Sequence, residues 1–233
     1  MARRSLMLTF AKWHIWLGWL VGVPMAMWLA SGLLMVSRPI EAVRGDHLRR
    51  DAPPTALVIP GSAIAAPDAK LEEMRVAMQD GRAVAILTTL DGGVSRVDFA
   101  SGASLPPLDA AAARALVAKQ IVGGDQVERV TLFPAERTPS DFSQPLAVWQ
   151  VQLPGGTNVY VGRDTGNIEA VRTRWWRAFD LAWGLHIMDL RGRDDTSHPI
   201  LIIFTALSLT GAVIGCALMF RRRRARPSAP PVA

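Results

Sequence analysis

Four histidines are the residues of this chain that could hold a redox cofactor: His14, His47, His186 and His198. Three of them, His14, His186 and His198, lie at or near the ends of two long apolar runs. An imidazole nitrogen in such a place can ligate haem iron. The alternative needs no cofactor, because histidine is amphipathic and suits a membrane boundary, as tryptophan and tyrosine do. The histidines thus indicate either a haem b site or an interfacial position.

The spacing of the histidines limits which of them could share an iron. The first apolar run would form a helix about 33 Å long, at about 1.5 Å per residue. His14 precedes this run, and His186 and His198 belong to its far side, so His14 cannot ligate the same iron as either. A bis-histidine haem would need His14 from two chains, His186 with His198 or His47, or a ligand from another subunit.

Other chemistry finds little support in the sequence. There is no Gly-x-Ser-x-Gly, no His-Glu-x-x-His, no phosphate-binding loop and no Rossmann fingerprint. Asp98, Asp125 and Asp164 fall at expected turns, where aspartate bonds to the backbone that follows it. Cys216 is the only cysteine, which excludes a disulfide within the chain and a cysteine metal site. We predict no catalytic residues, and no metal beyond a haem iron.

Two uncharged apolar runs, Ile15–Val36 and Ile200–Phe220, must position these histidines. Each is long enough for a helix that crosses a bilayer, which takes about 20 residues. A cleaved signal peptide is the alternative for the first run, but its apolar part is only about 7–15 residues long. All 20 acidic residues lie between the two runs, from Glu41 to Asp195. This pattern predicts a two-pass membrane protein with a folded middle.

The basic residues predict how the chain is oriented. Both tips are basic and without acidic residues, and the run Arg221, Arg222, Arg223 and Arg224 follows the second span directly. Because Lys and Arg collect on the cytoplasmic side, we expect both termini in the cytoplasm and the middle in the periplasm. The same run suits anionic lipid headgroups. The middle is nearly neutral, so the pI near 10.6 is no sign of nucleic-acid binding.

Each apolar run carries a GxxxG pair: Gly18 with Gly22, and Gly211 with Gly215. Small residues four apart let helix backbones approach closely in lipid. The pairs therefore predict helix packing, either within one chain or between two chains of a homodimer. Pro24 removes a backbone donor in mid-span and is expected to bend the first helix.

The middle contains one pattern of strands and glycine turns twice. Gly92-Gly93 and Gly155-Gly156 each join two strand-like runs, and Gly102 and Gly166 close the second run of each copy. A Gly-Gly pair between such runs predicts a hairpin. The runs after the Gly-Gly turns are 94–99 and 157–163.

A helix is expected before each copy of this pattern. The first covers Pro67–Gln79 and is closed by Asp80-Gly81; the second follows Asp109, a suitable N-cap, and ends near Gln120. Further strands are expected over 127–133, 146–153 and 168–172. The sequence therefore predicts an α+β domain in which each helix packs on a sheet.

The expected division of the chain has eight parts. These are a cytoplasmic tip (1–14), the first transmembrane helix (15–36), a periplasmic connector (37–66), a shortened unit (67–107), a complete unit (108–173), an interfacial amphipathic helix with its loop (174–199), the second transmembrane helix (200–220) and a basic cytoplasmic tail (221–233).

The complete unit resembles a PepSY domain. The similar features are Leu-Asp-x-Ala-Ala-Ala from Leu108, Val-Glu-Arg-Val from Val127, Val-Trp-Gln-Val-Gln-Leu from Val148, the Gly-Gly turn, and Val-x-x-Asp-Thr-Gly-Asn from Val161. The shortened unit resembles it with fewer of these features. Trp13-His14-Ile-Trp-Leu-Gly, Ser31-Gly-Leu-Leu and Gly184-Leu-His186 are similar to the flanks of PepSY-associated transmembrane proteins.

The resemblance implies a bacterial inner-membrane protein with two helices around an α+β periplasmic domain. PepSY domains are thought of as peptidase-modulating or envelope-binding modules. We therefore expect a non-catalytic binding or regulatory module with a periplasmic or membrane protein partner, and the strand after Gly166 is a candidate edge for strand addition. Larger relatives with four spans resemble haem-bearing ferric-siderophore reductases. The alternative is accordingly a haem b electron-transfer subunit in iron uptake, with His14, His186 and His198 as candidate ligands.

Overall fold

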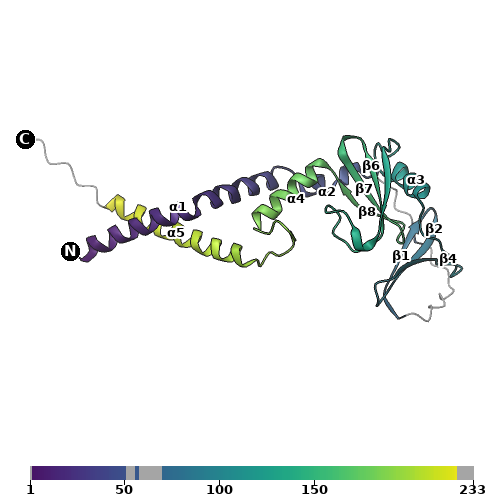
Figure 1. The fold of residues 1–233 in the computed structure, drawn as a ribbon, viewed down its shortest axis with the longest axis horizontal. Helices are drawn as coiled ribbons and strands as arrows, with labels where there is room; N and C mark the ends of the chain where they lie inside the picture. Colours follow the sequence, from purple (N-terminus) through teal and green to yellow (C-terminus); the bar gives the residue numbers. More distant parts are fainter. Residues whose placement is uncertain (1, 51–55, 58–69, 225–233) are drawn as a thin grey trace, which may run out of the picture. The chain divides into compact units, whose positions relative to one another are not determined.

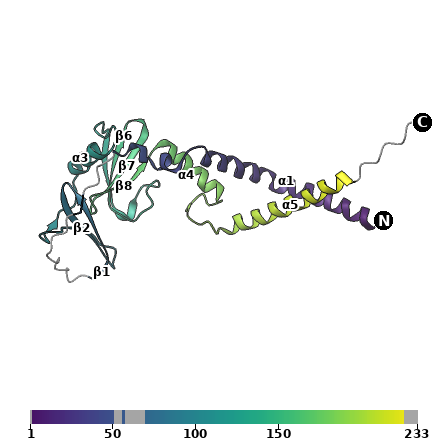
Figure 2. The ribbon, with the colours of Figure 1, turned by 180° about the vertical axis from the view of Figure 1, so that it is seen from behind.

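The computed structural model describes residues 2–50, 56–57 and 70–224, and it consists of two compact units. One unit is made of residues 1–38 and 178–233, and the other of residues 39–177. Figures 1 and 2 show the helices of the first unit and the sheets of the second. The helix α4, Arg174–His186, runs across the boundary between the units.

The first unit is built on two long helices, α1 (Ala2–Val36) and α5 (Pro199–Arg224), which lie side by side. Their apolar parts, Leu8–Val36 and Pro199–Phe220, are long and apolar enough to cross a membrane. Only 11% and 6% of their most apolar windows are buried in the chain, so neither is the core helix of a soluble domain. Both predicted apolar runs therefore form helices that fit a two-pass membrane protein.

The second sheet of the other unit is an antiparallel meander, β5 to β8, in the order of the sequence. Its strands are β5 (Arg129–Phe133), β6 (Val148–Leu153), β7 (Thr157–Gly162) and β8 (Ile168–Arg172). Three 3₁₀ turns, η1 (Asp46–Leu48), η2 (Ala135–Arg137) and η3 (Pro154–Gly156), lie in the connections of this unit. The predicted strands are thus confirmed, with small differences at their ends.

One helix, α3 (Ala110–Gln120), covers one face of this sheet. Asp109 begins it, because its side chain accepts a hydrogen bond of 2.7 Å from the backbone N–H of Ala112. Ala113 and Val117 are fully buried against the sheet residues Val151, Val159 and Val161. Alternation along the strands supplies this apolar face, and the predicted capped helix is confirmed.

The first sheet is a smaller antiparallel meander, β1-β2-β3-β4. It consists of β1 (Leu71–Gln79), β2 (Arg82–Thr89), β3 (Val94–Asp98) and β4 (Ser104–Leu105). The central strand β2 is buried from Val84 to Leu87. The α+β class and the two meanders that the glycine turns predicted are therefore present.

The helix predicted over Pro67–Gln79 is wrong over the part of it that the structure describes. Residues 71–79 form β1, which pairs with β2 from Leu71↔Thr89 to Gln79↔Arg82. Asp80 and Gly81 have φ of 50° and 79° and make the hairpin turn instead of ending a helix. Residues 67–69 lie outside the described residues.

Part of the stretch expected as a connector, 37–66, belongs to the second unit. The helix α2 (Ile40–Arg44) buries Val43, and Leu48 packs on the core beneath α3. Arg49 then forms an antiparallel bridge with Ile121 at the end of α3. Residues 51–55 and 58–66 of this stretch, and 225–233 of the basic tail, lie outside the described residues.

Candidate functional site

His186, the last residue of α4, packs against α1 in the helical unit. Its ring stacks on Trp28, with ring centroids 4.5 Å apart and planes inclined by 18°. Its Nδ1 atom lies 3.2 Å from both the Trp28 carbonyl and the Ser31 hydroxyl. A Cβ atom on Gly32 would lie 3.1 Å from the ring, so this glycine leaves room for the imidazole.

His14, in the first half of α1, makes a similar arrangement with α5. Its Nδ1 atom lies 3.0 Å from the carbonyl oxygen of Gly211 in α5. A Cβ atom on Gly215 would lie 2.7 Å from the His14 ring. The imidazole therefore lies against α5 at a place that is open because residue 215 is glycine.

The carbonyl partners decide which nitrogen of each ring carries the proton. A carbonyl oxygen only accepts, so Nδ1 of His14 donates to Gly211. The hydroxyl of Ser31 already donates to Trp28, at 2.8 Å, so Nδ1 of His186 must donate as well. In a neutral ring, donation from Nδ1 leaves the lone pair on Nε2, and neither Nε2 has a hydrogen-bond partner among the described residues. A neutral imidazole ligates a metal through such a nitrogen.

The two imidazoles cannot meet at one metal ion. His14 lies in the first part of α1, and His186 contacts residues 28–32, about 14 residues or roughly 21 Å further along the helix. The described residues contain no group of three or more His, Cys, Asp or Glu that could hold a metal. Within one chain, each of these histidines could offer one ligand.

The other two histidines lie elsewhere. His198 precedes the first turn of α5, and its buried Nδ1 atom has no hydrogen-bond partner among the described residues. His47 is exposed in η1 of the sheet-containing unit. Among the described residues no hydrogen bond or ring contact joins His198 to His186, and His47 belongs to the other unit. The pairs His186–His198 and His186–His47 therefore stay predictions.

The two GxxxG pairs lie in different surroundings. Gly211 and Gly215 face α1, where Leu17 and His14 are the nearest side chains. Gly18 and Gly22 have no atom of the described chain within 4 Å of the position where a Cβ would lie. Among the described residues, only the second pair packs against another helix of the chain. Arg221, Arg222, Arg223 and Arg224 form the last residues of α5.

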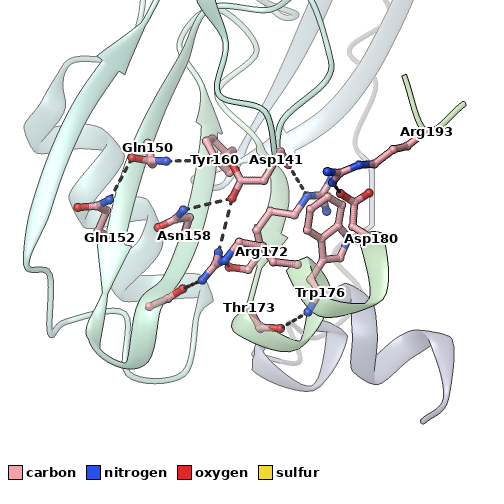
Figure 3. A network of polar contacts seen from close by, with 12 residues as sticks. Asp141, Gln150, Gln152, Asn158, Tyr160, Arg172, Thr173, Trp176, Asp180 and Arg193 are labelled. Atoms are coloured by element: carbon pink, nitrogen blue, oxygen red, sulfur yellow. Dashed lines mark hydrogen bonds and ion pairs between the residues drawn. The ribbon is translucent and has the colours of Figure 1, made fainter. Parts of the chain in front are cut away.

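The second sheet carries a polar network on the face opposite α3 (Figure 3). The hydroxyl of the fully buried Tyr160 donates to Asp141 at 2.5 Å and accepts from Gln150 at 2.7 Å. Asn158 donates to the same carboxylate at 3.3 Å. Burial, and then the hydrogen bond to Asp141, raise the pKa of Tyr160 well above its ordinary value. The phenol therefore stays protonated.

This network fixes the segment before β6 on the sheet. Arg172 of β8 donates to the backbone carbonyl of Asp141 at 2.8 Å, and its guanidinium lies 4.1 Å from the ring of Trp176. Arg177 lies 3.6 Å from the Asp141 carboxylate. Phe142 stacks on Tyr160 with centroids 4.8 Å apart. Both carboxylate oxygens and the backbone carbonyl of Asp141 are thus engaged, which indicates a structural network.

A cleft of about 800 Å³ lies in the sheet-containing unit, between α3, the β1–β2 hairpin and the β7–β8 turn. Its apolar side includes Met78, Leu108 and Leu116. The charged residues that line it, among those described, are four cations and one carboxylate: Arg49, Arg50, Arg96, Lys119 and Asp80. The carboxylate is paired with Lys119 at 2.8 Å, so the lining has an excess of positive charge.

Arg96 is the buried cation of this cleft, with only 8% of its surface exposed. Its guanidinium donates to the side chain of Gln79 at 3.1 Å and to the carbonyl of Pro106 at 2.8 Å. Its buried Nε atom has no hydrogen-bond partner among the described residues. Burial lowers the pKa of Arg96, and the charge of Asp164 acts in the opposite direction.

Gln79 joins the two sheets beside Arg96. Its amide nitrogen donates to the carbonyl of Thr165 at 2.9 Å and to the side chain of Asn167 at 3.0 Å. Gly166, between them, has a φ of +69°, and a Cβ there would lie 2.3 Å from Arg96. The turn that closes the second copy of the glycine pattern therefore lies directly on a residue of the first copy.

The other cations of the cleft lie nearer its surface. Arg50 donates to the carbonyl of Ile121 at 3.2 Å, just beyond the C-terminal end of α3, and Arg49 reaches the carbonyl of Ile168 at 3.4 Å. Both side chains are exposed. Each guanidinium has further N–H groups that can bind a ligand.

Sequence reasoning missed the cleft altogether. Its residues come from five separate segments of the chain and form no local motif. Arg96 stands between Ser95 and Val97 in a short strand, and nothing nearby in the sequence distinguishes it from an exposed strand residue. From the sequence, Gly166 was expected only as a turn glycine, not as a residue beside a binding site.

Comparison with known proteins adds no family assignment. No family model matches the chain, and no curated protein or solved structure matches it. The resemblance to PepSY domains and to PepSY-associated transmembrane proteins therefore stays a prediction from the sequence.

Proposed function

We propose that this protein is a membrane-anchored, non-catalytic binding or regulatory module of the PepSY type. In this proposal α1 and α5 cross the bacterial inner membrane with both termini in the cytoplasm, as the basic tips favour. The unit of residues 39–177 then lies in the periplasm and binds a protein partner there.

The cleft beside Arg96 is the observation that carries this proposal. Its volume, about 800 Å³, falls in the range of ligand sites, and it combines an apolar side with a few converging polar groups. Its lining residues belong to, or lie next to, α3 and the strands of both sheets. Such a surface can select a ligand without reacting with it.

The strand edge that the sequence suggested after Gly166 is a weaker binding site. The strand β8 is an edge of its sheet. However, the carbonyl of Ile168 accepts from Arg49, and that of Arg172 accepts from Arg177 at 3.3 Å. Side chains that take up edge carbonyls obstruct strand addition. We therefore favour the cleft over this edge.

Photo-crosslinking in cells tests the proposed function. A photoreactive residue at Ala115, which lines the cleft, should give a crosslinked product of defined mass. The same residue at Arg114, exposed on α3 and outside the cleft lining, is the matched control and should give none. The same products from both positions, or none from Ala115, would contradict binding in the cleft.

A haem b electron-transfer subunit for iron uptake is the second candidate. The observation that favours it is the hydrogen bond of Nδ1 to a backbone carbonyl in both His14 and His186, which leaves Nε2 as a ligand atom in the neutral ring. Haem would supply one-electron chemistry, and these two residues would hold it, with His198 as a further candidate. Because His14 and His186 lie far apart on α1, each haem would need its second ligand from another residue or another chain.

A further inference from the structure

The charge of the cleft indicates what kind of ligand it takes. Arg49, Arg50 and Lys119 line it, and the single carboxylate among its described lining residues, Asp80, is already paired with Lys119. Among the described residues, the side chains of Arg49 and Arg50 each donate one hydrogen bond to a backbone carbonyl, at 3.4 and 3.2 Å. Their remaining donors suit carboxylates, which guanidinium groups bind through two parallel N–H groups.

The rest of the lining points to more than a lone anion. The volume of about 800 Å³ is far larger than a small ion needs. Side-chain amides of Gln120 and Asn167 lie in the lining, and an amide both donates and accepts, as a peptide backbone requires. Leu108 and Leu116 offer an apolar surface beside them.

The buried Arg96 adds an observation independent of the surface charges. It lines the cleft, more than nine-tenths of it is buried, and its Nε lacks a partner among the described residues. A buried guanidinium nitrogen without a hydrogen bond is costly. The buried positive charge of Arg96 in the lining favours an anionic ligand in the cleft.

We propose that the cleft binds a short acidic peptide segment, with carboxylates at Arg49, Arg50 and Lys119 and an apolar side chain against Leu108 and Leu116. The inference rests on the proposed function and names the chemistry of its ligand. A segment of a partner protein that alternates acidic and apolar residues fits both sides of the cleft.

The test measures binding of labelled peptides to the full-length protein in detergent by fluorescence anisotropy. One probe alternates glutamate with leucine, and the other has lysine in place of glutamate. The glutamate peptide should bind about tenfold more tightly or better, and its affinity should fall as salt is raised. Equal affinity of the two peptides would overturn the inference.

Two variants locate the binding site. Arg49→Gln combined with Lys119→Gln should weaken the glutamate peptide about tenfold, because two charge contacts are removed. Arg114→Gln, a charge loss on the exposed surface of α3 outside the cleft lining, should leave the affinity unchanged. Equal weakening by the control, or displacement of the peptide by inorganic phosphate alone at the same concentration, would overturn the inference.

The outcome separates this inference from the proposed function. A crosslinked product from Ala115 without preference for the glutamate peptide overturns the acidic ligand and leaves the binding module in place. Absence of both overturns both.

Discussion

Gly166 lies so close to Arg96 that a side chain at position 166 would collide with the guanidinium group. A Cβ atom there would lie 2.3 Å from the Nη1 atom of Arg96. The turn between β7 and β8 can therefore approach the buried guanidinium of β3 only because residue 166 is glycine. This contact joins the two meanders and shapes one wall of the cleft.

Replacement of Gly166 should destabilise the sheet-containing unit by more than its backbone conformation alone explains. Gly166→Ala meets both a φ of +69° and Arg96, whereas Gly102→Ala meets the same φ with no atom of the described chain within 4 Å. We expect Gly102→Ala to cost about 1 kcal/mol and Gly166→Ala about 1–3 kcal/mol more. Thermal unfolding of both variants measures the difference, and equal losses would contradict the contact.

Arg96 and Gln79 should be energetically coupled. Their side chains share a hydrogen bond of 3.1 Å, and Gln79 also holds the β7–β8 turn. In a double-mutant cycle of Arg96→Met and Gln79→Ala, we expect a coupling free energy of about 1–2 kcal/mol. Denaturant unfolding of the four proteins gives this value, and additive losses would show that the two residues act independently.

Stability should fall at alkaline pH because of Tyr160. Its pKa is raised in the fold, whereas in the unfolded chain it is near 10. Above about pH 10 the unfolded chain releases the phenol proton and the folded chain keeps it. The stabilisation is therefore present below that pH and is lost, by about 1.4 kcal/mol per pH unit, as the pH rises above it.

The single tyrosine makes this prediction easy to follow. Tyrosinate absorbance should appear only when the protein unfolds, and Tyr160→Phe should remove this part of the pH dependence. Ordinary titration of the phenol in the folded protein would contradict its burial against Asp141.

The pairing of α1 with α5 should depend on one GxxxG pair and not on the other. Gly215→Val places a side chain where His14 lies, whereas Gly22→Val enters a space with no atom of the described chain within 4 Å. We expect Gly215→Val to weaken the helix pair by about 1–3 kcal/mol and Gly22→Val to change it little. Denaturation with increasing SDS compares them; a larger effect of Gly22→Val would point instead to packing between chains.

The sequence predicted those elements that local chemistry determines. Asp109 begins its helix because its side chain caps the next backbone amides, and Gly155 and Gly156 take positive φ in the hairpin as expected. The two apolar runs form long helices because each holds only uncharged residues over more than 20 positions.

The predicted helix over Pro67–Gln79 was wrong because two periodicities fit this one segment. Leu71, Met74 and Met78 are spaced as on a helix, whereas Met74, Val76 and Met78 alternate as on a strand. Pairing with β2 through the Asp80-Gly81 turn decides for the strand. The cleft could not be predicted, because its charges come from the Arg49–Arg50 segment, the β1–β2 turn, β3 and α3, which converge only in the folded chain.

The absorption spectrum of the purified protein tests most directly whether it works by binding or by electron transfer. The protein would be purified in detergent from cells supplied with haem, and its spectrum recorded oxidised and then reduced with dithionite. Our account predicts no Soret band beyond a small fraction of the protein, for the wild type and for His14→Ala and His186→Ala alike. A Soret band near stoichiometric with protein, which shifts on reduction and is lost in either variant, would contradict it.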